Sequence, residues 1–293
     1  MNKKTDGISK ALAEQCTAFF NSSGNTTDGS GAIDLSRTLP SVREIEAVEG
    51  LFRELVFPGH ICDNRYISKD VERHVSDCLD ELKHRLRRQV YAVLVYSTGC
   101  SECESEARAK EAIDSLIEQI PDLQSALYSD VRALYDGDPA AVSFSEIIFC
   151  YPGLSAVSSY RLANALSKLG VPLLPRIISE LAHSKTGIDI HPKATIGRYF
   201  AIDHGTGVVI GATSIIGEHV KIYQGVTLGA KSFPLDADGN PIKGIDRHPI
   251  IEDNVVIYSN ASIIGRVTIG SGAVIGANTF VSSDVVAGGK IIR

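Results

Sequence analysis

The most regular feature of the sequence is an aliphatic residue that recurs every six positions between Ile190 and Val281. An α-helix repeats every ~3.6 residues and an amphipathic strand every ~2, so neither element alone explains this period. A short strand followed by a turn, three times per coil, does explain it and predicts a parallel β-helix with these side chains stacked inside. The repeating positions are Ile190, Ile196, Ile202, Ile210, Ile216, Ile222, Leu228, Ile251, Ile257, Ile263, Ile269, Ile275 and Val281.

The six-residue pattern is interrupted twice. Its register slips by two residues between Ile202 and Ile210, and it is lost between Leu228 and Ile251. The second interruption contains a polar stretch, 231–249, which we expect to leave the coils as a long loop. Such loops on a regular scaffold are usually functional or disordered. All the repeating positions together correspond to about four to five coils.

The N-terminal part of the chain shows helical spacing instead. Ser41 followed by Glu44 is a capping-box pattern, in which each side chain accepts a hydrogen bond from the other residue's backbone N–H. The expected helices are 42–56, 68–96, 101–120, 122–136 and 153–169, and the apolar run at 91–96 is equally compatible with a strand.

Composition supports a division of the chain into three segments. The Gly/Ser-rich stretch 21–31 cannot bury enough surface to order itself, so residues 1–39 are expected to form a flexible arm. A helical domain at 40–186 follows, and then a β-helix domain at 187–293. Sixteen of the 26 glycines lie in 187–293, where turns are frequent. That segment carries nine Lys/Arg and nine Asp/Glu, so the net charge of −6 belongs to the residues before it.

Several classes of protein are not expected from the composition. A membrane span needs ~18 apolar residues in a row, and a secretory signal needs an apolar core near the N-terminus; neither pattern is present. A mildly acidic chain without basic runs is a poor binder of nucleic acid. The Cys100/Cys103 pair has no second ligand pair nearby, so we expect ordinary thiols and no metal. Cysteines without a framework spacing fit a reducing compartment, which predicts a cytoplasmic protein.

Four short motifs in the repeat region and two upstream of it resemble serine O-acetyltransferases, a family of hexapeptide-repeat acyltransferases. The resemblance covers about 135–290 and implies an α+β protein, in which an all-helical N-terminal domain precedes a left-handed parallel β-helix. It also implies transfer of acetyl from acetyl-CoA to the L-serine hydroxyl, giving O-acetyl-L-serine for cysteine biosynthesis. The motifs are Gly137-Asp-Pro-Ala140, Tyr151-Pro-Gly153, Asp189-Ile-His-Pro192, Asp203-His-Gly-Thr-Gly207, Thr227-Leu-Gly-Ala230 and Asp246-Arg-His-Pro249.

The resemblance assigns roles to particular residues. His204 is the implied general base and Asp189 the carboxylate that orients its imidazole; an imidazole with a pKa near ~6.5 suits proton abstraction at neutral pH. The implied serine-binding residues are Asp138, Asp203, Arg247 and His248. An arginine can pair with the serine carboxylate and an aspartate with its ammonium.

The family also implies contacts to acetyl-CoA and to other subunits. Backbone groups near Gly229, Ser259 and Ala277 are the implied contacts to acetyl-CoA, in a groove between neighbouring subunits. The expected assembly is therefore a homotrimer or a dimer of trimers. Family members that bind the next enzyme, cysteine synthase, do so through a terminal isoleucine. The last residue here is Arg293, so a stable complex with that enzyme is not expected.

Two features depart from the family pattern, and three other functions remain as alternatives. The loop before Asp246 is longer than usual, and Tyr258-Ser-Asn260 replaces a Gly-rich turn. A related acyltransferase would use another acceptor, such as an amino sugar. A zinc lyase on the same fold would need three histidines meeting between subunits. His204, His219 and His248 supply the number but lack the spacing. A catalytically silent scaffold would not need the His204/Asp189 pair.

Overall fold

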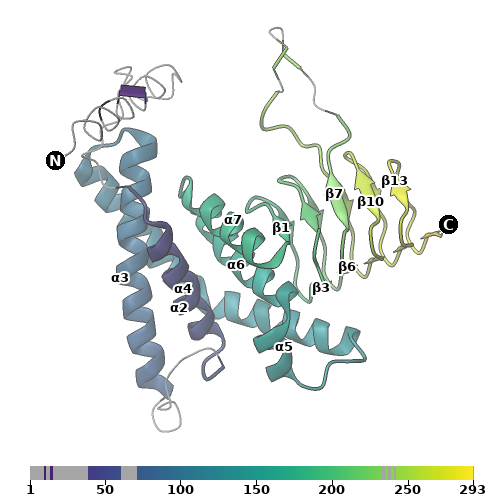
Figure 1. Ribbon diagram of the computed structural model, residues 1–293, viewed down its shortest axis with the longest axis horizontal. Helices are drawn as coiled ribbons and strands as arrows, with labels where there is room; N and C mark the ends of the chain where they lie inside the picture. The colour runs from purple at the N-terminus through teal and green to yellow at the C-terminus, as the bar shows by residue number, and fades with distance from the viewer. Residues whose placement is uncertain are drawn as a thin grey trace.

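The structure is a computed structural model in which helices gather at one end and a stack of short strands forms the other (Figure 1). It describes residue 10 and the ranges 14–15, 39–60, 71–232, 235–236, 239–240 and 242–292. Most of the expected arm 1–39, and the terminal Arg293, lie outside the described residues.

Six helices make up the described part of the N-terminal domain. They are α2 (Val42–Val56), α3 (Val71–Thr98), α4 (Glu102–Gly137), α5 (Phe144–Cys150), α6 (Pro152–Lys168) and α7 (Leu174–Thr186). The expected helices 42–56 and 153–169 are confirmed to within a residue at each end. The ambiguous run 91–96 is helical, because it continues α3 and buries Val93 and Leu94 against the other helices.

The sequence prediction was wrong at three points in this domain. The helices 101–120 and 122–136 are one helix, α4, with Pro121 inside it; buried side chains on both sides of the proline, Ile120 and Leu127 among them, hold the helix together. α5 and α7 were not predicted. The capping box is only half formed: Ser41 Oγ accepts from the Glu44 N–H, but the Ser41 N–H donates to Gln89 Oε1 at 2.8 Å.

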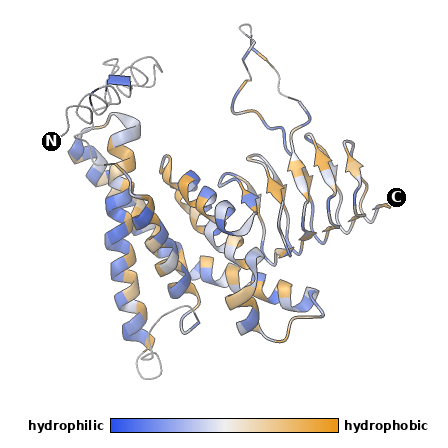
Figure 2. Cartoon of the chain, in the orientation of Figure 1, coloured by the Kyte–Doolittle hydropathy of each residue, from blue (hydrophilic) through white to orange (hydrophobic). Residues whose placement is uncertain are grey.

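The C-terminal domain is the predicted parallel β-helix. Its strands are β1 (Asp189–Ile190), β2 (Thr195–Ile196), β3 (Ala201–Asp203), β4 (Val209–Ile210), β5 (Ile215–Ile216), β6 (Lys221–Tyr223), β7 (Thr227–Gly229), β8 (Ile250–Ile251), β9 (Val256–Ile257), β10 (Ser262–Ile264), β11 (Thr268–Ile269), β12 (Val274–Ile275), β13 (Phe280–Val281) and β14 (Lys290–Ile291). They form three parallel sheets, ordered β1-β4-β7-β10-β13, β2-β5-β8-β11 and β3-β6-β9-β12-β14. Figure 2 shows hydrophobic residues concentrated on these strands.

The register of the sheets is the register of the six-residue repeat. Ile190 pairs with Ile210, Ile210 with Leu228, and Leu228 with Ile263. The other two sheets stack their aliphatic residues in the same way, so the buried core of the domain is three columns of Ile, Leu and Val side chains.

Both interruptions of the repeat lie at corners of the prism. The turn between β3 and β4, residues 204–208, is two residues longer than the turn between β6 and β7, residues 224–226. The second interruption lies between β7 and β8, where the chain leaves the prism after β7 (Figure 1), and the strands on either side still pair with their neighbours in register.

Close contacts join the two domains. Arg161 on α6 forms a buried pair with Asp130 on α4, and its guanidinium also donates to the carbonyl of Gly197 at 2.9 Å. At Gly153 on α6 a β-carbon would lie 2.1 Å from the carbonyl oxygen of Ile202. The helical domain is therefore fixed directly against β3, the strand that leads into the longer corner.

Candidate active site

His204 lies at the longer corner, between β3 and β4. Three of the five residues of this turn have positive φ: His204 (58°), Gly205 (96°) and Gly207 (83°). The left-handed region is unfavourable for a residue with a β-carbon, but other turns of this β-helix also use it, as at His219 (56°) and Asn260 (59°). The His204 side chain is 74% exposed. The two-residue slip in the sequence register thus builds a turn that presents an imidazole to solvent.

The helical domain brings Asp138 to the same corner. Asp138 is the C-cap of α4, and its carboxylate accepts hydrogen bonds from the Ala140 N–H at 2.8 Å and from the Tyr151 hydroxyl at 2.6 Å. The bond from Tyr151, with smaller contributions from Ala140 and nearby Lys221 and His204, lowers the pKa of Asp138. The carboxylate is therefore ionised at neutral pH and held in one orientation.

Lys221 on β6 links Asp203 to the end of α4, and none of the sequence motifs indicated it. Its Nζ lies 2.9 Å from Asp203 Oδ2, donates to the carbonyl of Gly137 at 2.6 Å, and lies 4.5 Å from the centre of the Tyr223 ring. Asp203 and Lys221 are both largely buried. The pairing of β3 with β6 could have indicated this contact. Lys221 lies opposite Ala201 and Tyr223 opposite Asp203, so Lys221 and Asp203 are diagonal neighbours on the two strands.

Arg247 and His248 lie at a different corner, where β8 begins. Thr213 holds both: its hydroxyl oxygen accepts from the backbone N–H of Arg247 at 3.0 Å and from that of His248 at 3.1 Å. The imidazole of His248 packs on Gly211, where a β-carbon would lie 1.9 Å from the ring.

The hydrogen bonds of His248 fix its tautomer. Its Nδ1 accepts from the Thr213 N–H at 3.2 Å, so in the neutral ring the proton is on Nε2. Burial, together with the positive charges of Arg247 and Arg266, lowers the pKa of His248. At neutral pH this side chain is therefore an uncharged hydrogen-bond donor.

One chain does not bring these two groups of residues together. The His204 corner precedes the sheet that contains β4, and the Thr213–His248 corner follows it. Residues 207–211 cross between the two corners, a span on the order of 15 Å at ~3.3 Å per residue.

Asp189 lies at the start of β1, beside the backbone of the longer corner. Its N–H donates to the carbonyl of Val208 at 2.9 Å. Its carboxylate lies near Glu180 and His183 of α7, with all three ligand atoms within 4.8 Å of one another. Within the described part of the chain, His204 Nε2 instead lies 3.9 Å from Asp203 Oδ1. The expected pairing of Asp189 with His204 stays a prediction.

The residues expected to contact acetyl-CoA lie in two corner columns. Ser259 and Ala277 are in the column of the His204 corner, where backbone hydrogen bonds connect successive turns: Gly225 to Thr206, Asn260 to Gln224, and Asn278 to Ser259. Gly229 lies in the column of Thr213, at the end of β7. Tyr258, in the turn that differs from the family pattern, stacks on Tyr223 with ring centres 5.2 Å apart.

The histidines of the zinc-lyase alternative occupy three separate corners of the prism. His219 lies between β5 and β6, where its ring packs on Tyr199. His204 and His248 lie at the other two corners. The structure of one chain therefore does not assemble them into a zinc site.

Two family models match the sequence. "Serine acetyltransferase, N-terminal" matches residues 73–159, and "Bacterial transferase hexapeptide (six repeats)" matches residues 248–283. A plasmid-borne serine acetyltransferase of Synechococcus elongatus is 46% identical over 260 residues, which are 86% of this chain and 81% of that protein.

Solved structures give the same picture. The crystal structure of Entamoeba histolytica serine acetyltransferase 1 in complex with L-cysteine matches with a TM-score of 0.74 and 38% identity, over 84% of this chain and 85% of that one. Neisseria gonorrhoeae serine acetyltransferase in complex with serine matches with a TM-score of 0.56 and 27% identity, over 84% and 95% of the two chains.

Among the described residues, the structure contains no helix that combines the length and the apolar character needed to cross a membrane.

Proposed function

Because this chain belongs to the serine acetyltransferase family, we propose that it transfers acetyl from acetyl-CoA to the L-serine hydroxyl at the His204 corner, giving O-acetyl-L-serine for cysteine biosynthesis. The observation that supports the proposal is that Lys221 joins Asp203 to the carbonyl of Gly137, the residue before Asp138. The ionised Asp138 carboxylate lies close enough to Lys221 and the exposed His204 imidazole for their charges to lower its pKa. This combination offers a base and a binding site for a cation.

The proposed reaction needs no covalent enzyme intermediate. Neutral His204 removes the serine hydroxyl proton while the oxygen attacks the thioester carbonyl. The C–S bond then breaks, and the imidazolium returns the proton to the sulfur of coenzyme A. His248 is the proposed donor to the oxyanion, because its proton is on Nε2 and the ring is neutral.

Serine recognition follows from charge. Asp138, Asp203 and Lys221 together carry one net negative charge, which suits the serine ammonium. Arg247 is the proposed partner of the serine carboxylate, in the bidentate geometry that a guanidinium allows.

We propose that the site is completed by a second copy of the chain. Arg247 and His248 lie across a sheet from His204, so in one chain they would not reach the same serine molecule. A homotrimer places the His204 corner of one copy beside the His248 corner of the next. The acetyl-CoA residues Ser259 and Gly229, which lie in different corner columns, would meet in the same groove.

The test of the base is acetyl-CoA consumption with L-serine. His204→Ala is expected to lower kcat by about 10²–10⁴-fold, the contribution of a general base. The matched control is His219→Ala, because His219 is also exposed and has nearly the same backbone φ, 56° against 58°. Full activity in His204→Ala, or consumption that does not depend on serine, would contradict the proposal.

The orienting carboxylate is tested separately. Asp189→Asn is expected to lower kcat with little change in the KM for serine, because it would disturb the imidazole tautomer. Asp203→Asn is expected to raise the KM for serine. The reverse result would assign the orienting role to Asp203, whose carboxylate is 3.9 Å from His204 Nε2.

The shared site is tested by complementation. His204→Ala and Arg247→Ala subunits are each expected to be inactive alone. Co-expressed in equal amounts, they should regain about a quarter of wild-type activity, since one neighbouring pair in four combines the two intact corners. No recovery in a mixed trimer would show that each chain forms its own site.

A further inference from the structure

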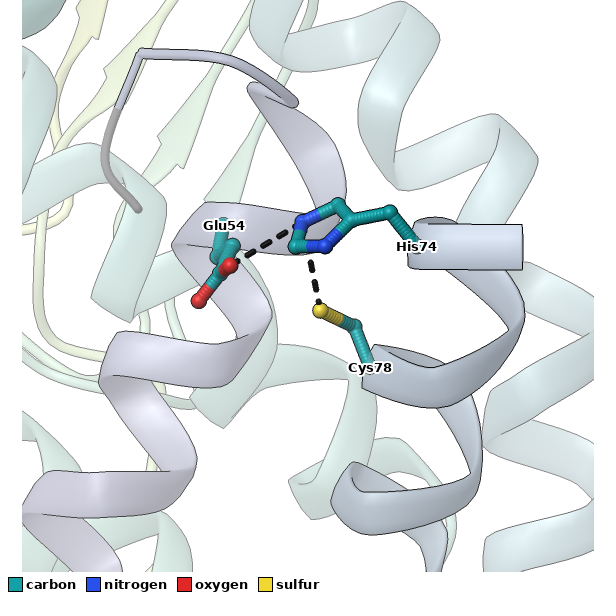
Figure 3. A group of neighbouring side chains, drawn as sticks. All are labelled: Glu54, His74 and Cys78. Atoms are coloured by element: carbon teal, nitrogen blue, oxygen red, sulfur yellow. Dashed lines mark hydrogen bonds and ion pairs between the residues drawn. The ribbon is translucent and has the colours of Figure 1, made fainter. Parts of the chain in front are cut away.

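A cluster of three potential metal ligands lies between α2 and α3, in the helical domain and away from the candidate active site (Figure 3). Glu54 is near the end of α2. His74 and Cys78 are four residues apart on α3, and this spacing places them on one face of the helix. Figure 3 shows the imidazole of His74 between the other two side chains.

The ligand atoms of Glu54 and Cys78 both lie close to the Nε2 atom of His74. His74 Nε2 lies 3.0 Å from Glu54 Oε1 and 3.5 Å from Cys78 Sγ, and all three ligand atoms are within 4.8 Å of one another. In a tetrahedral zinc site with Zn–N of about 2.0 Å and Zn–S of about 2.3 Å, the nitrogen and sulfur are about 3.5 Å apart, and a nitrogen and an oxygen about 3.3 Å apart. Both distances from Nε2 are close to these values.

A single proton position on Nε2 can serve only one of its two neighbours at a time. Nε2 has one position, which holds either a proton or a lone pair. A proton there can be donated to the Glu54 carboxylate but not at the same time to Cys78. Without the proton, Nε2 can accept from the thiol, but it then faces the carboxylate lone pair to lone pair. A cation at the centre would interact favourably with all three groups.

Burial and charge are also compatible with a metal. The side chains of His74 and Glu54 are 18% and 19% exposed, and Cys78 is 7% exposed. A thiolate, a carboxylate and a neutral imidazole carry two negative charges, which a divalent cation neutralises; a neutral site is less unfavourable to bury. A mixed set of sulfur, nitrogen and oxygen ligands favours zinc over magnesium or calcium.

We propose that Glu54, His74 and Cys78 bind one zinc-type divalent cation, which would clamp the end of α2 to the start of α3. Water or another ligand would take the fourth position. The site has no part in the acetyl transfer, so its failure would leave the proposed function untouched.

The experiment uses the untagged full-length chain, stripped with chelator and titrated with Co²⁺ and then Zn²⁺. We expect one Co²⁺ per chain with thiolate-to-cobalt charge-transfer absorbance, displaced by Zn²⁺. Cys78→Ser should lose that absorbance, and the matched control Cys103→Ser should keep it, because Cys103 is exposed on α4. Glu54→Gln and His74→Ala should weaken Zn²⁺ binding by more than the ~100-fold that loss of an outer partner costs.

Two further readouts keep the result decisive. The first is the serine acetyltransferase activity of each variant. Because Glu54, His74 and Cys78 have no part in that reaction, retained activity shows that the variant has folded. Zn²⁺ should raise the melting temperature of the wild type but not of Cys78→Ser, because only a folded site binds the metal. The proposal is overturned if wild type binds no metal at excess Zn²⁺, if Cys78→Ser shows the same cobalt spectrum, or if the absorbance disappears in Cys103→Ser instead.

Discussion

The buried pair of Asp130 and Arg161 offers the sharpest test of how the two domains are held together. The guanidinium donates to both carboxylate oxygens, at 2.6 Å and 2.8 Å, and the Phe200 N–H donates to Asp130 at 3.0 Å. The side chains are 1% and 8% exposed. Asp130→Asn keeps the shape of the side chain but leaves the guanidinium buried without its counter-charge.

The expected loss follows from this geometry. Removing one partner of a buried pair costs about 3–5 kcal/mol, because the other charge stays desolvated. At ~2–4 °C per kcal/mol for a chain of this order of size, the melting midpoint should fall by about 6–20 °C. Arg161→Met should cost a similar amount. The double variant should lose less than the sum of the two, with a coupling of about 0.5–3 kcal/mol.

The assay is scanning calorimetry of the two single variants, the double variant and a control. The control is Glu106→Gln, which breaks an exposed pair with Arg87 between α3 and α4 and should have little effect. A midpoint for Asp130→Asn within about 2 °C of wild type would refute the expected cost of leaving Arg161 without its counter-charge. Strict additivity in the double variant would refute the coupling between the two side chains.

Two other predictions concern charge. Asp138→Asn should lower kcat/KM for serine by about 10²-fold, because a charge-assisted contact to the serine ammonium is lost. The control Asp122→Asn, at an exposed position on the same helix, should leave kcat/KM unchanged. Steady-state kinetics with varied serine measures both variants. Burial, aided by nearby cations including Arg176, lowers the pKa of His191 to about 4. As the pH falls, the unfolded state therefore takes up the His191 proton before the folded state does. The contribution of neutral His191 to the free energy of unfolding should be complete above pH ~6.5 and decline as the pH falls toward ~4. His191→Asn should flatten that decline in urea unfolding curves recorded across this range.

The β-helix could be predicted in detail from the sequence, whereas the helical domain could be predicted only in outline. The six-residue period located the strand positions and the stacking of their inward side chains, because each coil repeats the same local requirement for an inward aliphatic residue. The helices were harder. Pro121 signals a break, but side-chain packing on both sides of it keeps α4 continuous. α7 was missed although Ile178 and Ala182 are buried in it.

The candidate site divides in the same way. The motifs named His204, Asp138 and Asp203 through the family resemblance. They did not name Lys221, because its role depends on a contact with the carbonyl of Gly137, 84 residues earlier in the chain. They also did not indicate the Glu54, His74 and Cys78 cluster, since only two of its members are close in sequence.

The sequence by itself therefore determined the β-helix, its register and the corner that carries His204, because these depend on short-range repetition and on a two-residue change in turn length. The tertiary structure decided which helical residues reach that corner and how far His204 lies from His248. Those relations depend on where long helices end against the strands, as at Gly153 and Asp130, and a local pattern of residues does not encode such distances.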